Sequence, residues 1–342
     1  MTVAGSIASV PEREHARPRL PRPRGPLSGH VLHHLRRPPH PLPPPPSVGH
    51  SDPLADDDLQ LALYHCYELH DRGLAGVDER WEWDPSLLAF RMGLEDRFER
   101  ALARLVGPPP EVVGPTADTL WALVDRATGP SLSAFVAESA TLEQVCELAV
   151  HRSAYQLKEA DPHTWAIPRL AGRAKAAMVE IQADEYGGGV TAEMHASLFA
   201  VTMAALGLDP TYGAYLDRIP GVTLATVNLV SLFGLHRRWR GALVGHLAVF
   251  EMTSVGPMGR YSRALERLGV APEARRFYDV HVVADAHHQT VASEAMAATL
   301  AADEPDLAAD ILYGAAAVMA VEGRFAAHVL DAWAEDRSSL LR

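Results

Sequence analysis

The stretch HVVADAHH, from His281 to His288, places three histidines and an aspartate in a segment that otherwise has the pattern of a buried helix. The flanking residues RRFYD and QTVASEAMAATLA extend it into one continuous helix. An α-helix turns by about 100° per residue, so His281, Asp285 and His288 share one narrow stripe and His287 points away from it. Imidazoles and a carboxylate on an interior stripe are costly unless they are paired or bind a metal.

The helical pattern continues over almost the whole chain beyond residue 55. Thr141 and Gln144 form a capping box, and an Asp-Pro pair begins the segment at residue 84. Strand patterns bounded by turns are absent, so the sequence predicts an all-α helix bundle. Apolar residues recur at helical spacing in 59–73, 84–106, 141–160, 168–186, 191–207, 223–234, 236–254, 272–301 and 305–335.

The first part of the chain differs in composition from the rest. Residues 1–53 are rich in proline and arginine and end in HPLPPPPSVGHSDP, which favours extended or disordered backbone over a packed core. We therefore predict a disordered tail over 1–53 and one domain over 54–342. The PPPP run is either a linker or a ligand for a polyproline-reading domain.

Composition and charge restrict the class of protein. The chain has 342 residues, 48% hydrophobic, with a net charge of −12 although its first 54 residues are basic. An acidic body argues against a nucleic-acid partner. No run resembles a signal peptide or a membrane span. Cys66 and Cys146 are the two cysteines and are far apart in the sequence, which argues against a disulfide framework and favours a reducing, cytoplasmic location.

The stripe HxxxDxxH has two readings: a polar helix face that happens to contain histidines, or three metal ligands presented to one volume. Other inward polar residues favour the second reading. Glu185 ends an otherwise apolar stripe, His195 shares its stripe with Phe199, and Glu159 lies in the last turn of its helix. A single such residue is usually a hydrogen-bonded core residue, but several on neighbouring helices indicate a site.

The runs YQLKEADPHTWAIPRL, EIQADEYGGGVTAEMHASLF and FYDVHVVADAHH resemble the haem-oxygenase-like di-metal oxidases, the iron-containing redox enzymes. The resemblance covers roughly residues 55–335. It implies a seven-helix haem-oxygenase-like bundle, with the first helices of this chain as additional scaffold and lid. It also implies six metal ligands, which carried over position by position are Glu159, Glu185, His195, His281, Asp285 and His288.

Carboxylate and imidazole ligands favour Fe(II), with Mn(II) as the alternative, and neither cysteine is near them. The resemblance implies two such ions, O₂ as co-substrate and no haem. Spacing alone leaves open how the ligands divide between the ions. Glu251 is either an additional ligand, a hydrogen-bond acceptor behind the ligands, or a helix-end charge paired with an arginine.

Several other residues carry weaker signals. We expect His163 to be a surface or structural loop residue, and His236 and His246 to lie on a solvated basic face. Arg169, or one of Arg237, Arg238 and Arg240, is a candidate for binding a substrate carboxylate. The sequence does not select among these arginines.

The resemblance implies a di-iron oxidase or oxygenase that oxidises a small metabolite during natural-product assembly. The favoured substrate is an α-amino acid, through C–H abstraction leading to desaturation or cyclisation of the azetidine kind. N-oxygenation or C–C fragmentation of an amino acid or fatty acid is the alternative. A metal-free or haem-using relative and a non-catalytic metal-binding protein remain open. The family also implies a homodimer, with no nucleic-acid or membrane partner expected.

Overall fold

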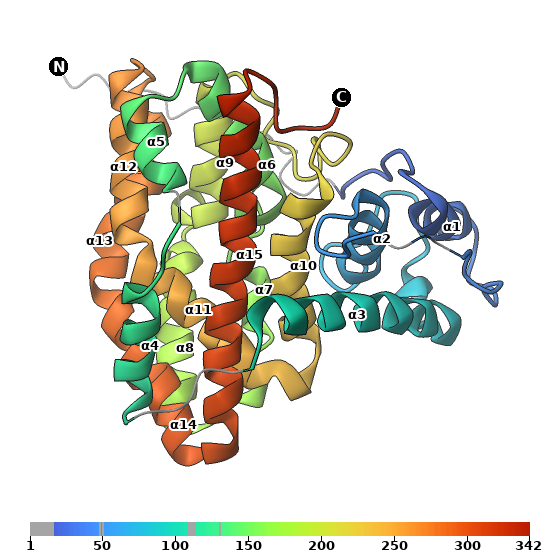
Figure 1. Cartoon of the computed structure of the whole chain (residues 1–342), viewed down its shortest axis with the longest axis horizontal. Helices are drawn as coiled ribbons and strands as arrows, with labels where there is room; N and C mark the ends of the chain where they lie inside the picture. The colour runs from blue at the N-terminus through green and yellow to red at the C-terminus, as the bar shows by residue number, and fades with distance from the viewer. Residues whose placement is uncertain (1–16, 48, 50, 109–113, 130) are drawn as a thin grey trace.

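The computed structural model describes residues 17–47, 49, 51–108, 114–129 and 131–342, and its helices are shown in Figure 1. No β-strand occurs among these residues, so the predicted all-α fold is confirmed. The helices are α1 (Pro26–Leu35), α2 (Asp57–Glu68), α3 (Pro85–Val106), α4 (Thr116–Asp125), α5 (Leu132–Glu138), α6 (Leu142–Gln156), α7 (Asp161–Thr164), α8 (Gly172–Glu185), α9 (His195–Ala205), α10 (Gly221–Leu235), α11 (Arg240–Thr253), α12 (Val255–Arg267), α13 (Arg276–Thr290), α14 (Thr299–Asp303) and α15 (Ala308–Ala334). A π-helix, Val291–Ala298, connects α13 to α14.

The main bundle is built from the helices that follow α3. In Figure 1, α15 runs the length of the bundle, while α1, α2 and α3 lie together at one side. None of the helices in the described part of the chain is long and apolar enough to cross a membrane.

Helices α11 and α15 cross at very short range. A Cβ atom added to Gly245 would overlap the Ile311 carbonyl oxygen, and one added to Gly314 would overlap Ala242. Only glycine permits so close a backbone approach. This contact fixes the position of α11, the helix that carries Glu251.

Helix ends follow the signals in the sequence. The Thr141–Gln144 capping box is present, and the Asp84 side chain accepts from the backbone N–H groups of Ser86 and Leu87. Glycines 187–189 separate α8 from α9, and Gly187 has a φ of 62° with the Glu193 backbone where a Cβ would lie. The chain can therefore turn sharply between Glu185 and His195.

Helix α1 corrects the expectation that residues 1–53 lack packed structure. Its buried side chains, Leu27, Val31, Leu32 and Leu35, have helical spacing and join the main hydrophobic core. The Asp58 carboxylate accepts hydrogen bonds from the backbone N–H groups of Leu27 and Ser28, at 2.8 and 2.7 Å, which satisfies the first turn of α1. The surrounding prolines obscured this short apolar pattern. Residues 1–16 lie outside the described residues.

Candidate metal centre

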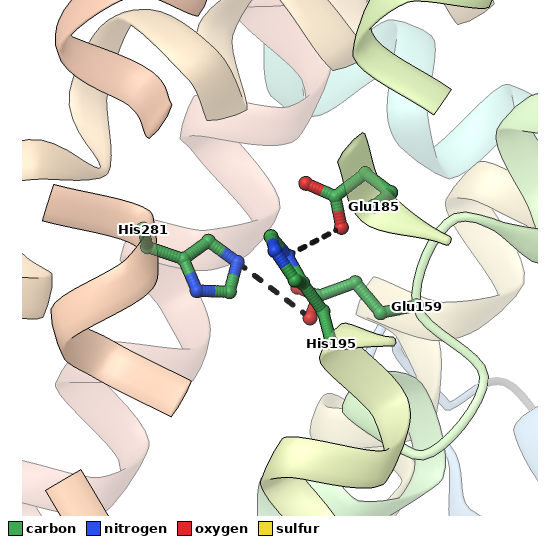
Figure 2. Close-up of side chains that lie close together, drawn as sticks. All are labelled: Glu159, Glu185, His195 and His281. Carbon is green, nitrogen blue, oxygen red and sulfur yellow. Dashed lines mark ion pairs between the residues drawn. The ribbon is translucent and has the colours of Figure 1, made fainter. Parts of the chain in front are cut away.

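Four of the predicted side chains meet in the interior of the bundle. Glu159 follows α6, Glu185 ends α8, His195 begins α9, and His281 lies on α13. One ligand-type atom from each lies within 4.8 Å of the others. Figure 2 marks two ion pairs among them: His195 Nδ1 is 2.9 Å from Glu185 Oε2, and His281 Nε2 is 3.7 Å from Glu159 Oε2. We call these four residues the first ligand group.

A second group adjoins the first and shares Glu185 with it. Glu185, Glu251 and His288 also present ligand atoms within 4.8 Å of one another. His288 Nδ1 lies 3.3 Å from Glu251 Oε2 and 3.4 Å from Asp285 Oδ1. Asp285 is therefore beside the second group, where its other oxygen accepts a hydrogen bond from Ser254 Oγ. Of the readings open for Glu251, the structure excludes a pairing with a nearby arginine, because its partner is His288.

The atoms that face the centre are buried and lack hydrogen-bond partners. Within the described part of the chain this is so for six of them: Glu159 Oε2, Glu185 Oε2, His195 Nδ1, Glu251 Oε2, Asp285 Oδ1 and His288 Nδ1. The His195–Glu185 contact is short but is not aligned for a hydrogen bond. Leaving one buried polar group unsatisfied costs about 1–3 kcal/mol. Coordination of cations would satisfy all six atoms at once, so the residues fit a metal centre.

Two of the imidazoles are held by hydrogen bonds on their far side. His281 Nδ1–H donates to the Phe277 carbonyl oxygen at 2.7 Å, which leaves Nε2 facing Glu159. His288 Nε2–H donates to Asp184 Oδ2 at 2.9 Å, which leaves Nδ1 facing Glu251. Metal-binding histidines commonly have such a partner, which fixes the tautomer and orients the ring. Sequence reasoning missed Asp184, although it precedes Glu185 in the DEYG motif.

The centre brings several carboxyl groups together away from water. Burial raises the pKa of Glu159 and of Glu251 well above the usual range, and neighbouring carboxylates add to both shifts. Burial also opposes ionisation of Glu185, but the adjacent His195 outweighs it and lowers the pKa of Glu185 to about 2. For His288, burial is outweighed by Asp285 and Glu251, which raise its pKa to about 11. Bound divalent cations would favour the ionised form of these carboxyl groups.

Local backbone geometry positions Glu159. The next residue, Ala160, has a φ of 73°, a left-handed conformation that is rare for residues other than glycine. The Gln182 side chain on α8 donates to the Ala160 carbonyl oxygen at 2.9 Å and to Thr164 Oγ1 at 2.7 Å. The turn after α6 is thereby tied to the helix that carries Glu185.

The structure corrects the prediction for His246, which is 1% exposed rather than on a solvated face. His163 is also 1% exposed and lies on α7, so of its two readings the structural one agrees with the structure. His163 Nε2 and His246 Nδ1 are 3.0 Å apart. His236 lies at the bundle edge and pairs with Glu95 at 2.9 Å.

Three of the arginines considered for a substrate carboxylate have other partners. Arg169 donates to the carbonyl oxygens of Gly234 and Leu235, which end α10. Arg238 pairs with Glu99, and Arg240 pairs with Glu304.

Four carboxylates and three imidazoles at the centre of an all-α bundle define a helical protein with a candidate metal centre. Comparison with known families agrees with this description. The model of the iron-containing redox enzymes matches residues 146–323, which include every member of both ligand groups. The chain belongs to this haem-oxygenase-like family of iron-containing redox enzymes. No curated protein sequence matches it.

Proposed function

We propose that this chain is an O₂-dependent oxidoreductase with a non-haem di-iron cofactor. The observation that carries the proposal is Glu185, a single carboxylate common to two buried ligand groups. Glu159, His195 and His281 would hold one ion with Glu185, and Glu251 and His288 would hold the other, with Asp285 beside it. Oxygen and imidazole donors suit Fe(II), with Mn(II) as the alternative. When bound, such a pair of ions supplies O₂ activation.

The protein's own residues prepare the site. Asp184 and the Phe277 carbonyl oxygen each hold a proton at the far nitrogen of an imidazole, so that the other nitrogen keeps its lone pair. Burial of Glu185, His281 and Asp285, each at most 7% exposed, excludes bulk water and strengthens electrostatic interactions in the site.

The proposed substrate is a small metabolite, with an α-amino acid favoured by the family resemblance. The proposed outcome is C–H abstraction leading to desaturation or azetidine-type cyclisation. Reduction of O₂ to water consumes more electrons than desaturation releases, so an external reductant supplies the remainder. N-oxygenation or C–C fragmentation of an amino acid or fatty acid is the alternative outcome. We place the protein in the cytoplasm, as a homodimer without nucleic-acid or membrane partners.

Anaerobic iron titration tests the cofactor assignment. The full chain should bind two Fe(II), Glu251→Ala should bind one, and Glu185→Ala should lose the paired site. Glu180→Ala is a matched control, because Glu180 lies on the same helix but forms an exposed pair with His287 at 3.0 Å. Two bound Fe(II) in the Glu185→Ala variant would refute the shared-carboxylate centre.

Oxygen uptake by the iron-loaded chain tests the activity. Uptake should accelerate with one member of a panel of free amino acids and fatty acids, in the presence of ascorbate as reductant. Iron that binds but never reacts with O₂ under any of these conditions would indicate a non-catalytic metal-binding protein instead.

A further inference from the structure

A buried-edge ion pair joins α6 to α15. Arg152 Nη1 is 3.0 Å from Glu322 Oε1, and Arg152 Nη2 is 2.7 Å from Glu322 Oε2. Arg152 and Tyr155 lie three residues apart on α6, and Glu159 follows just beyond the end of that helix. The Arg152 charge is near enough to Glu159 to oppose the burial that raises the pKa of that carboxyl.

Aromatic side chains surround the pair. The Arg152 guanidinium lies over the Phe325 ring, 4.3 Å from its centroid. Tyr261 and Tyr278, whose rings are 5.6 Å apart, are close enough to interact with the Arg152 charge. Burial raises the pKa of Tyr155, and the carboxylates of Glu159 and Glu322 both add to that shift. Tyr155 therefore lies within electrostatic reach of both the metal centre and the charged pair.

The charged pair is enclosed without being sealed. The side chains of Arg152 and Glu322 keep 23% and 24% of their surface exposed, whereas Lys158, just after the end of α6, keeps 1%. Water can therefore reach both charges.

We propose that Arg152 and Glu322 form the substrate-recognition site, binding the α-carboxylate and the α-ammonium group of a free amino acid. This inference rests on the proposed oxidase function and names its substrate class. The planar guanidinium fork matches a carboxylate bidentately, and a glutamate carboxylate accepts from an ammonium group. In the free protein the two side chains satisfy each other. A bound amino acid would replace that single ion pair by two, one between its carboxylate and Arg152 and one between its ammonium group and Glu322.

The same pair discriminates against substrates with one charge. A fatty acid would pair with Arg152 and leave Glu322 without a partner. A simple amine would pair with Glu322 and leave Arg152 without one. A site whose buried polar groups are left unpaired rejects the incomplete analogue strongly. The side chain of the amino acid would then extend past Tyr155 toward the ligand groups.

Calorimetric binding to the anaerobic, Fe(II)-loaded full chain tests the proposal. Each of the twenty common L-amino acids is titrated, and a binder is compared with the amine and the acid that lack one of its charges, such as 3-methylbutylamine and 4-methylpentanoate for leucine. Loss of either charge should weaken binding about 10- to 100-fold. Arg152→Gln should abolish the preference over the amine, and Glu322→Gln the preference over the acid.

Two further variants separate recognition from a structural α6–α15 contact. The exchange Arg152→Glu with Glu322→Arg keeps the ion pair, so it should melt near the wild-type temperature but bind the amino acid at least about tenfold more weakly. Arg324→Gln, on the same helix and in the exposed pair with Asp52, should bind like wild type.

The outcomes also distinguish this proposal from the oxidase function. It is overturned if no amino acid binds, or if Arg152→Gln and Glu322→Gln change stability but not selectivity. Two bound Fe(II) and O₂ uptake driven by a fatty acid would leave the oxidase function standing while refuting the amino-acid site. Selective amino-acid binding by a chain that binds no iron would refute the oxidase function and leave the amino-acid site standing.

Discussion

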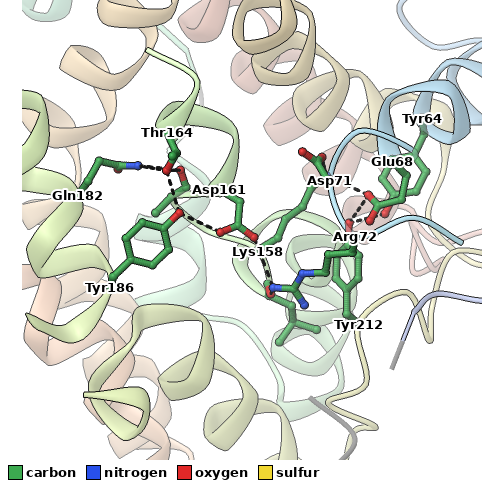
Figure 3. A network of polar contacts seen from close by, with 12 residues as sticks. Tyr64, Glu68, Asp71, Arg72, Lys158, Asp161, Thr164, Gln182, Tyr186 and Tyr212 are labelled. Atoms are coloured by element: carbon green, nitrogen blue, oxygen red, sulfur yellow. Dashed lines mark hydrogen bonds and ion pairs between the residues drawn. The ribbon is translucent and has the colours of Figure 1, made fainter. Parts of the chain in front are cut away.

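Replacing Lys158 by methionine should lower the free energy of unfolding by about 3–5 kcal/mol, because it breaks a buried ionic cluster on one side only. Lys158 is 1% exposed, and its Nζ lies 3.1 Å from Glu68 Oε2 and 2.8 Å from Asp71 Oδ2 (Figure 3). Tyr212 donates to Glu68 at 2.7 Å, and its hydroxyl is 2.7 Å from that of Tyr64. The cluster ties α2 to the end of α6.

The size of the expected stability loss depends on the two carboxylates that the substitution leaves without a cation. Methionine fills most of the space, so the loss is electrostatic: two carboxylates, 0% and 9% exposed, would remain without their cation. Burial alone already raises the pKa of Glu68, and Lys158 opposes that shift. Replacing all partners with neutral side chains is often nearly neutral for stability. The triple variant with Glu68→Gln and Asp71→Asn should therefore recover most of the loss.

Urea unfolding followed by circular dichroism measures these differences. Lys175→Met, at the partly exposed other lysine of the chain, is the matched control and should change stability by less than about 0.5 kcal/mol. Because Lys158 precedes Glu159, the single variant should also bind Fe(II) more weakly at the first ligand group. A loss below about 1 kcal/mol for Lys158→Met, or a triple variant less stable than the single one, would refute the reasoning.

Three further predictions concern separate features. Asp184→Asn should weaken Fe(II) binding at the second ligand group about 10- to 100-fold by titration, with Glu180→Ala unchanged, because Asp184 orients His288. Ala160→Gly should raise the free energy of unfolding by up to about 1 kcal/mol, whereas Ala160→Val should lower it by about 1–3 kcal/mol in urea melts, since φ is 73°. Burial lowers the pKa of His65 to about 4, so the unfolded chain binds more protons below pH about 6.5 and stability falls as pH falls toward 4. His65→Leu should reduce this slope by up to about 1.4 kcal/mol per pH unit, and an unchanged slope would contradict the assignment.

The sequence was most informative where periodicity and motif coincide. Helical spacing predicted that His281, Asp285 and His288 share one stripe of α13, and all three are buried on it. The capping box at Thr141 predicted where α6 begins. These features depend only on neighbouring residues within the same helix, so the local sequence is enough to predict them.

Features that depend on tertiary contacts were harder to predict from the sequence. His246 lies close to three arginines in sequence, which suggested a solvated face, but α11 turns its histidine inward against His163. Arg152 and Glu322 are 170 residues apart, and neither stands out in its own helix. The left-handed conformation of Ala160 could not be predicted from the sequence, because it is glycine or asparagine that usually indicates such a position.

The spacing of the two ligand groups is set by helix α13 and by the glycine break that follows α8. His281 and His288 are seven residues apart on α13, a rise of about 10 Å along the axis, so a single helix contributes to both groups. Glu185 stands between them at the end of α8, where the glycine break brings His195 to the same point. Because Glu185 belongs to both groups, a shift of α8 relative to α13 would disturb both at once. The hydrogen bonds from Gln182 to the Ala160 carbonyl oxygen and from His288 to Asp184 oppose that shift, so these two neighbours of Glu185 determine how firmly the centre is held.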